Sequence, residues 1–243
     1  MFEDNADPRL SNEHVRTVTT AAGRITLVGV VHDHPASVFR AREVVSRREP
    51  AVLGLELPPL AVPLFREYAR DKQTPPSFGG EMSAAIQAAD TDRLVGIDGP
   101  SRRFMRQLAA SLVEERADSG TIRSVAEALA VASKSAITSR FAAIISQFRA
   151  TPIDVSRPWE YDVDITDSAD LQAADERQHL GRAQALSASL IPPTSKRIRD
   201  EVREKQMVAE LASVADAGEV VAIVGRNHLD PVASELTNRS RSG

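Results

Sequence analysis

The chain has 243 residues, 42% of them apolar, and a formal net charge of −4. It is therefore long enough for one sizeable core, and its composition is typical of a globular protein. The mild negative charge argues against general nucleic-acid binding, and the absence of cysteine excludes disulfides, thiolate nucleophiles and zinc–thiolate sites.

The N-terminal segment MFEDNADPRLSNEHV is acidic and polar, unlike a secretory signal. No run approaches the roughly 20 apolar residues that a membrane-spanning helix needs. We therefore expect a soluble, cytoplasmic protein without a membrane span.

The N-terminal part of the chain alternates between β-branched apolar runs and helical patterns. This alternation predicts an α/β fold in which a mostly parallel or mixed central sheet is flanked by helices. In chain order we expect a lead-in strand near 15–20, a strand over 24–31, a helix over 36–48, a strand over 51–57, a helix over 60–71, a short helix from Glu81 and a strand over 93–98.

The middle of the chain is helical in pattern. Residues 101–190 are expected to form a helical insertion within a single domain over 1–243, covering one end of the sheet as a lid. A break rich in proline and aspartate is expected over 151–168.

The C-terminal part begins with the helix breaker Ile191-Pro192-Pro193. A charged helix then starts with Thr194 as its N-cap and ends near Gly218. Residues 219–224 predict a last strand that inserts into the same sheet, and we expect the tail NRSRSG to be disordered.

Two Gly-x-x-His motifs follow two of the predicted strands, Gly29 to His32 and Gly225 to His228. One such motif is common by chance, but two after two apolar strands favour a site. A glycine at this place lets the strand end turn tightly and lets another group come close.

Four predicted strands end in chemically capable side chains: His32, Glu56, Asp98 and His228. Parallel strands deliver their ends to one crevice, where ligands bind in open α/β sheets. Two imidazoles and one or two carboxylates match a divalent-metal site whose bound water supplies hydroxide. Without metal, a neutral histidine beside a carboxylate is a general base. Glu56, inside an apolar strand, needs a partner such as a metal or an arginine.

Structural roles compete with these functional ones. Asp98 could stabilise the turn at Asp-Gly-Pro, and His34 could cap the helix that follows it. His14 and His179 lie in polar surroundings and are expected at the surface. The charged stretch Lys196–Lys205 is expected to be a solvated helix face with i,i+4 ion pairs.

Six segments in this order resemble the TraB/PrgY family, which is related to TIKI and GumN-type proteins and to the ChaN and erythromycin-esterase-like fold group. They are GVVH, GLEL, GGEMSAAIQAA, GIDGPSRRFMR, VREKQMVAEL and IVGRNHLDPV. The resemblance implies a metal-dependent, peptidase-like hydrolase using a divalent ion such as manganese, cobalt or zinc.

The strand-end residues and the resemblance together suggest residue roles, in which Glu81 or Asp98 could also serve as an additional metal ligand or as the general base. The metal ligands would be His32, Glu56 and His228. The catalytic residues would be Glu81, Asp98, Arg203 and Glu204, and the substrate-binding residues His34, Arg106 and Asn227.

Three hypotheses stay open. The first is the metal-dependent hydrolase, acting on a peptide or small-molecule substrate, with a homodimer left open. The second is a non-catalytic regulatory protein that sequesters a peptide or cofactor. The third is a metal-free esterase that survives chelation and depends on His228.

Overall fold

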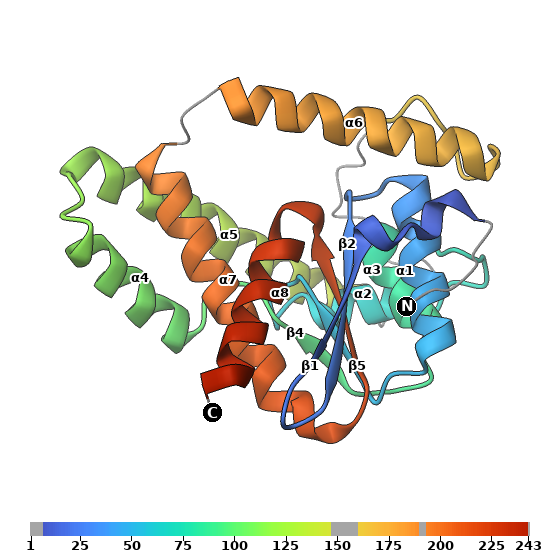
Figure 1. Cartoon of the computed structure of the whole chain (residues 1–243), viewed down its shortest axis with the longest axis horizontal. Coiled ribbons are helices and arrows are strands. Elements are labelled where there is room, and N and C mark those ends of the chain that lie inside the picture. The colour runs from blue at the N-terminus through green and yellow to red at the C-terminus, as the bar shows by residue number, and fades with distance from the viewer. Residues whose placement is uncertain (1–6, 147–159, 190–192, 243) are drawn as a thin grey trace.

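The computed structural model describes residues 7–146, 160–189 and 193–242. Its centre is one five-stranded sheet in the order β1-β2-β5-β3-β4, in which β1 is antiparallel to β2 and the other neighbours are parallel (Figure 1). The predicted α/β fold with a mixed sheet is therefore confirmed. The strands are β1 Val15–Thr19, β2 Arg24–Val30, β3 Val52–Leu55, β4 Leu94–Gly96 and β5 Val220–Gly225.

Helices cover both faces of this sheet. Cores on its two sides are closed by α1 and α3 on one face and by α7 and α8 on the other. The helices are α1 Pro35–Arg48, α2 Val62–Tyr68, α3 Gly80–Ala88, α4 Arg102–Glu114, α5 Ser119–Ser146, α6 Ala169–Ser189, α7 Thr194–Val214 and α8 Arg226–Ser242, with short 3₁₀ turns at Pro8–Leu10, Asn12–His14 and Ala215–Ala217.

The last strand of the chain inserts into the same sheet, as predicted, and the structure places it in the middle. All six residues of β5 are buried, because alternate side chains enter the two cores. Val224 packs toward α7 and α8, whereas Ile223 packs toward α1 and α3. Val30 of β2 pairs with Gly225, and Leu55 of β3 pairs with Ile223. The carboxyl ends of three strands therefore meet at one edge.

The prediction of a disordered tail is wrong, because α8 continues to Ser242. Its buried residues Leu229, Val232, Ala233 and Leu236 recur at the i, i+3, i+4 and i+7 spacing of an amphipathic helix and join the core. Pro231 and the polar end of the chain obscured this pattern.

The ends of α7 differ slightly from expectation. Its N-cap is Pro193 rather than Thr194, and no side chain caps the helix there. Gly218 ends the 3₁₀ turn that extends α7, with a positive φ of 122° that favours glycine. Ile191 and Pro192, and residues 151–159 of the predicted break, lie outside the described residues.

Helix α5 presents large apolar side chains to solvent. Ile137, Phe141 and Ile144 are exposed, whereas the buried residues of the helix are Val125 and several alanines and serines. Among the described helices, α5 is long and apolar enough to cross a membrane by length and composition alone. The absence of a membrane span therefore stays a prediction.

A buried polar cluster ties α6 to the sheet side of α1. Arg40, fully buried, donates to both carboxylate oxygens of Glu176, and Ser37 also donates to Glu176. His14 lies with its Nε2 at 3.7 Å from Glu176 and is 5% exposed, so the expectation of a surface histidine is wrong. Burial lowers the pKa of His14 to about 4.

This histidine makes the fold sensitive to acid. Between pH 6.5 and 4 the unfolded chain gains a proton at residue 14 that the folded chain does not, so the free energy of unfolding falls as pH falls. The slope from this group is about 1.4 kcal/mol per pH unit. Urea unfolding of wild type and of His14→Gln between pH 7 and 4.5 measures it. The free energy of unfolding of the variant should depend less steeply on pH than that of wild type. Parallel curves of free energy against pH would show that His14 is not the source of the acid sensitivity.

Candidate functional site

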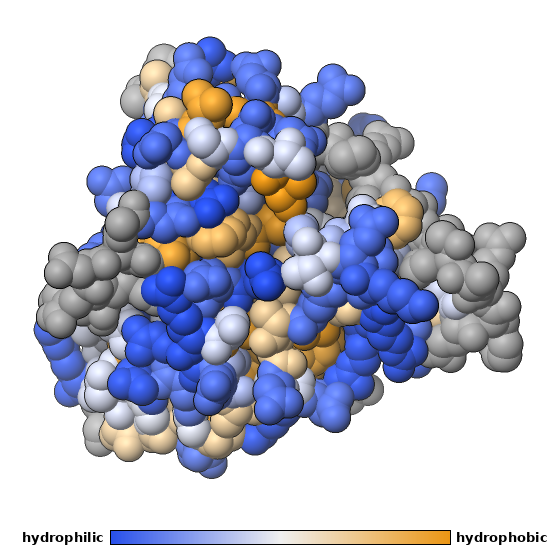
Figure 2. Space-filling view, turned by 90° about the vertical axis from the view of Figure 1, so that its right-hand side faces the viewer, coloured by the Kyte–Doolittle hydropathy of each residue, from blue (hydrophilic) through white to orange (hydrophobic). Residues whose placement is uncertain are grey.

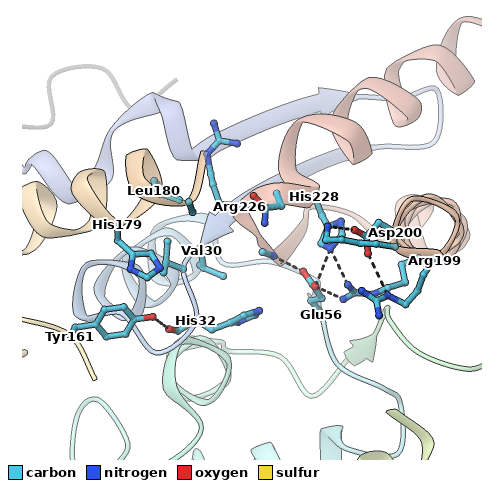
Figure 3. Close-up of a pocket in the computed structure, with 16 residues that line it drawn as sticks. Val30, His32, Glu56, Tyr161, His179, Leu180, Arg199, Asp200, Arg226 and His228 are labelled. Carbon is cyan, nitrogen blue, oxygen red and sulfur yellow. Dashed lines mark hydrogen bonds and ion pairs between the residues drawn. The ribbon is translucent and has the colours of Figure 1, made fainter. Parts of the chain in front are cut away.

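A cavity of about 420 Å³ opens at the carboxyl edge of the sheet (Figure 3). It receives side chains from the loops after β2 and β3, from the first turn of α8, which follows β5 directly, and from α6 and α7. Those that bear on its chemistry are His32, Glu56, Tyr161, Arg203, Asn227 and His228. The predicted meeting of strand ends therefore occurs, and two of its histidines face one space.

Arg203 of α7 is the centre of the site. Its guanidinium donates to Glu56 Oε1 at 2.6 Å and to Asp98 Oδ2 at 2.8 Å. Both of these bonds come from Nη2, and the other terminal nitrogen, Nη1, lies 3.1 Å from His228 Nε2. The arginine partner that Glu56 required is thus supplied, and three strand-end residues are joined through one permanent cation.

The contacts of His228 determine its tautomer. Arginine only donates hydrogen bonds, so Nε2 of His228 must accept from Arg203. The ring proton is then on Nδ1, which donates to Glu204 Oε1 at 2.9 Å. His228 is therefore a neutral imidazole held by a carboxylate, with its basic nitrogen at the cavity wall.

His32, unlike His228, is protonated and carries a positive charge. Its Nδ1 donates to Glu81 Oε1 at 2.7 Å, and the other oxygen of Glu81 accepts from the backbone N–H of Asp33. The hydrogen bond to buried Glu81 raises the pKa of His32 to about 9, against the opposing effect of burial. At neutral pH His32 is therefore an imidazolium, whereas Nε2 of His228 accepts a hydrogen bond from Arg203.

The glycines of the two motifs have packing roles. The backbone N–H of Gly225 donates to Glu56, and a Cβ there would lie 3.3 Å from the carboxylate. A Cβ on Gly29 would lie 2.8 Å from Cδ2 of Leu229, so the Leu229 side chain of α8 would have to shift. Both glycines allow the close approach that the sequence predicted.

The proposed metal ligands do not fit a metal ion in this arrangement. Glu56 uses one oxygen for Arg203 and the other for Gly225, and the Nε2 lone pair of His228 also faces the guanidinium. The cation of Arg203 thus occupies the place a metal would need. Within residues 7–146, 160–189 and 193–242, no group of three or more histidines and carboxylates is placed to hold an ion.

The remaining predicted residues lie in different places. Glu81 and Glu204 stand behind the two histidines, and Asn227 lines the cavity. His34 is fully buried, where it caps α1 by accepting from the Ala36 N–H and pairs with Asp175. Arg106 is exposed on α4, away from the residues that line the cavity.

Several cavity residues were not predicted. Tyr161 donates to the backbone oxygen of His32 at 2.5 Å, and His179 comes from α6 (Figure 3). Lys196 and Arg199 project from α7 beside Arg203. Their spacing of three and four residues was visible in the sequence, but it was attributed to a solvated face.

A second cavity of about 510 Å³ adjoins the first, and Tyr161 lines both. Its walls combine polar residues such as Asp33 and Asp164 with apolar ones such as Val38 and Phe78. On the side of the molecule shown in Figure 2, apolar residues gather in patches within a mostly hydrophilic surface.

No protein-family model matches the chain, and neither a search of curated proteins nor one of solved structures found a significant match. The TraB/PrgY resemblance therefore stays a prediction.

Proposed function

We propose that the protein hydrolyses an ester or amide bond, with neutral His228 as general base and no metal in the step. The observation that carries this proposal is the position of His228, fixed between Glu204 and Arg203 at the wall of the cavity. The pairing of a base with an orienting carboxylate is the arrangement that general-base hydrolases use. The family resemblance supports the same reaction class.

The reaction begins when water takes the place of Arg203 at Nε2 of His228. His228 removes a proton from this water, and the hydroxide adds to the carbonyl carbon. Arg203 and cationic His32 stabilise the resulting oxyanion, since both present N–H donors with full positive charge. His228 then gives its proton to the leaving oxygen or nitrogen as the C–O or C–N bond breaks, and an acid is released with an alcohol or amine.

Chelation and pH separate this proposal from its rivals. The full chain is assayed on nitrophenyl esters and short peptides, before and after dialysis against a chelator, with elemental analysis of the same sample. We expect hydrolysis that survives chelation and declines above about pH 9, where His32 loses its proton. The His32→Gln variant should lack this alkaline decline.

The rival outcomes are equally clear. Activity that is lost on chelation and restored by manganese or cobalt would support the metal-dependent hydrolase instead. A tightly retained ligand without turnover would support the sequestering protein.

A further inference from the structure

Cationic side chains on one face of α7 line the cavity, and they differ in how deeply they are buried. Lys196, Arg199 and Arg203 recur at intervals of three and four residues, so they share a face, and all three line the cavity. The exposed fraction of the side chain falls from 56% at Lys196 to 39% at Arg199 and 25% at Arg203. The row therefore runs from the mouth of the cavity inward to Arg203 and its contacts with Glu56, Asp98 and His228.

The cations of this row are unequally neutralised. Arg203 has two carboxylate partners, Glu56 and Asp98. Lys196 and Arg199 share the single carboxylate of Asp200, at 2.7 Å and 3.6 Å. Figure 3 shows Arg199 and Asp200 side by side near His228.

Arg199 is the member of this row whose N–H donors are least used in the described interactions. Among the described interactions its guanidinium makes only the 3.6 Å ion pair, which is too long for a hydrogen bond. The other cavity arginine, Arg226, pairs with Asp230 at 3.0 Å. The carboxylates among the described lining residues are Glu56 and Asp200.

We propose that Arg199, with Lys196, binds an oxyanion of the substrate, so that the molecule hydrolysed carries a carboxylate or phosphate near the scissile bond. This rests on the proposed function for the reaction, whereas the anion site is a claim about binding. Arg199 precedes Arg203 by four residues, or about 6 Å along the helix. The anionic group therefore lies roughly that distance from the carbonyl that Arg203 polarises.

The bidentate fork of arginine suits this task. Its two parallel N–H donors match the two oxygens of a carboxylate or two of a phosphate, which fixes orientation as well as charge. An anion held at Arg199 would place the adjoining carbonyl beside His228 and Arg203. Arg199 is thus a residue that selects anionic substrates.

Calorimetric titration with succinate and with inorganic phosphate tests the site without any assay of turnover. We expect both to bind the wild-type chain, with the tighter one identifying the oxyanion, and Arg199→Gln to weaken binding about tenfold or more. The matched control is Arg197→Gln on the same helix, which pairs with Glu115 outside the cavity and should bind as wild type does. Circular dichroism confirms that both variants are folded.

The results that would overturn the proposal are specific. They are no binding of either anion to folded wild type, or equal affinities for wild type and Arg199→Gln. On hydrolysed esters, Arg199→Gln should lower the ratio of kcat/KM for an anionic ester to that for its neutral isostere. Anion binding without turnover would leave the anion site standing and remove the hydrolase, whereas turnover without anion preference would do the reverse.

Discussion

A His228→Ala variant is expected to hydrolyse substrate about 10²–10⁴-fold more slowly than wild type, the range typical for loss of a general base. The loss should appear in kcat, because the imidazole acts on the attacking water and not on substrate binding. Steady-state kinetics on the best ester or amide substrate measure it. The matched control is His179→Ala, since His179 also lines the cavity but contacts neither Arg203 nor the carboxylates of the cluster.

The same kinetic experiment measures how much Glu204 contributes by holding the His228 ring in its tautomer. Glu204→Ala removes the carboxylate that holds the Nδ1 proton, so kcat should fall by less than in His228→Ala and its pH profile should change. If His228→Ala retained full activity while folded, His228 would not be the base. Equal losses in His179→Ala and His228→Ala would point to a general effect on the cavity.

Replacing Glu176 with leucine is expected to lower the free energy of unfolding by about 3–5 kcal/mol, because it leaves the fully buried guanidinium of Arg40 without a counter-charge. Removing both charges in Arg40→Met/Glu176→Leu should recover much of this loss, since no buried charge is then left unpaired. Urea unfolding at pH 7 with constant m-values provides the measurement.

An exposed pair supplies the control for this cycle. Lys205 and Glu201 on α7 form an i,i+4 ion pair with both side chains 46% exposed. Glu201→Leu should change the free energy of unfolding by no more than about 1 kcal/mol. If Glu176→Leu cost as little as Glu201→Leu, the buried pair would not be the anchor of α6.

The sequence was sufficient to predict which strand ends meet. His32, Glu56, Asp98 and His228 each follow an apolar run, and parallel strands bring such ends to one edge whatever the helices do. The position of Arg203 could not be predicted in this way. It depends on how α7 is rotated, which is set by packing of its buried residues against the sheet.

The sequence contains a signal for this rotation of α7. Val202 and Met207 of α7 are fully buried, and Arg203 lies beside the first and one turn before the second. Arg203, at the border of this apolar stripe, enters the protein and is 25% exposed, which the alternation of charges did not indicate. The outer pairs Lys196–Asp200 and Lys205–Glu201 do form as expected, so the prediction for α7 was correct for its solvated side alone.

The buried Arg40–Glu176 pair, which holds α6 against α1, has a consequence for how molecules reach the site. Glu176 lies three residues before His179 and four before Leu180, both of which form the cavity wall, yet Glu176 itself is not among the described lining residues. Whatever loosens the Arg40–Glu176 pair therefore also loosens the cavity wall. Cohesion of the core and the position of this wall thus depend on one carboxylate, so a core substitution away from the site, such as Glu176→Leu, is expected to change the rate of hydrolysis as well as the stability.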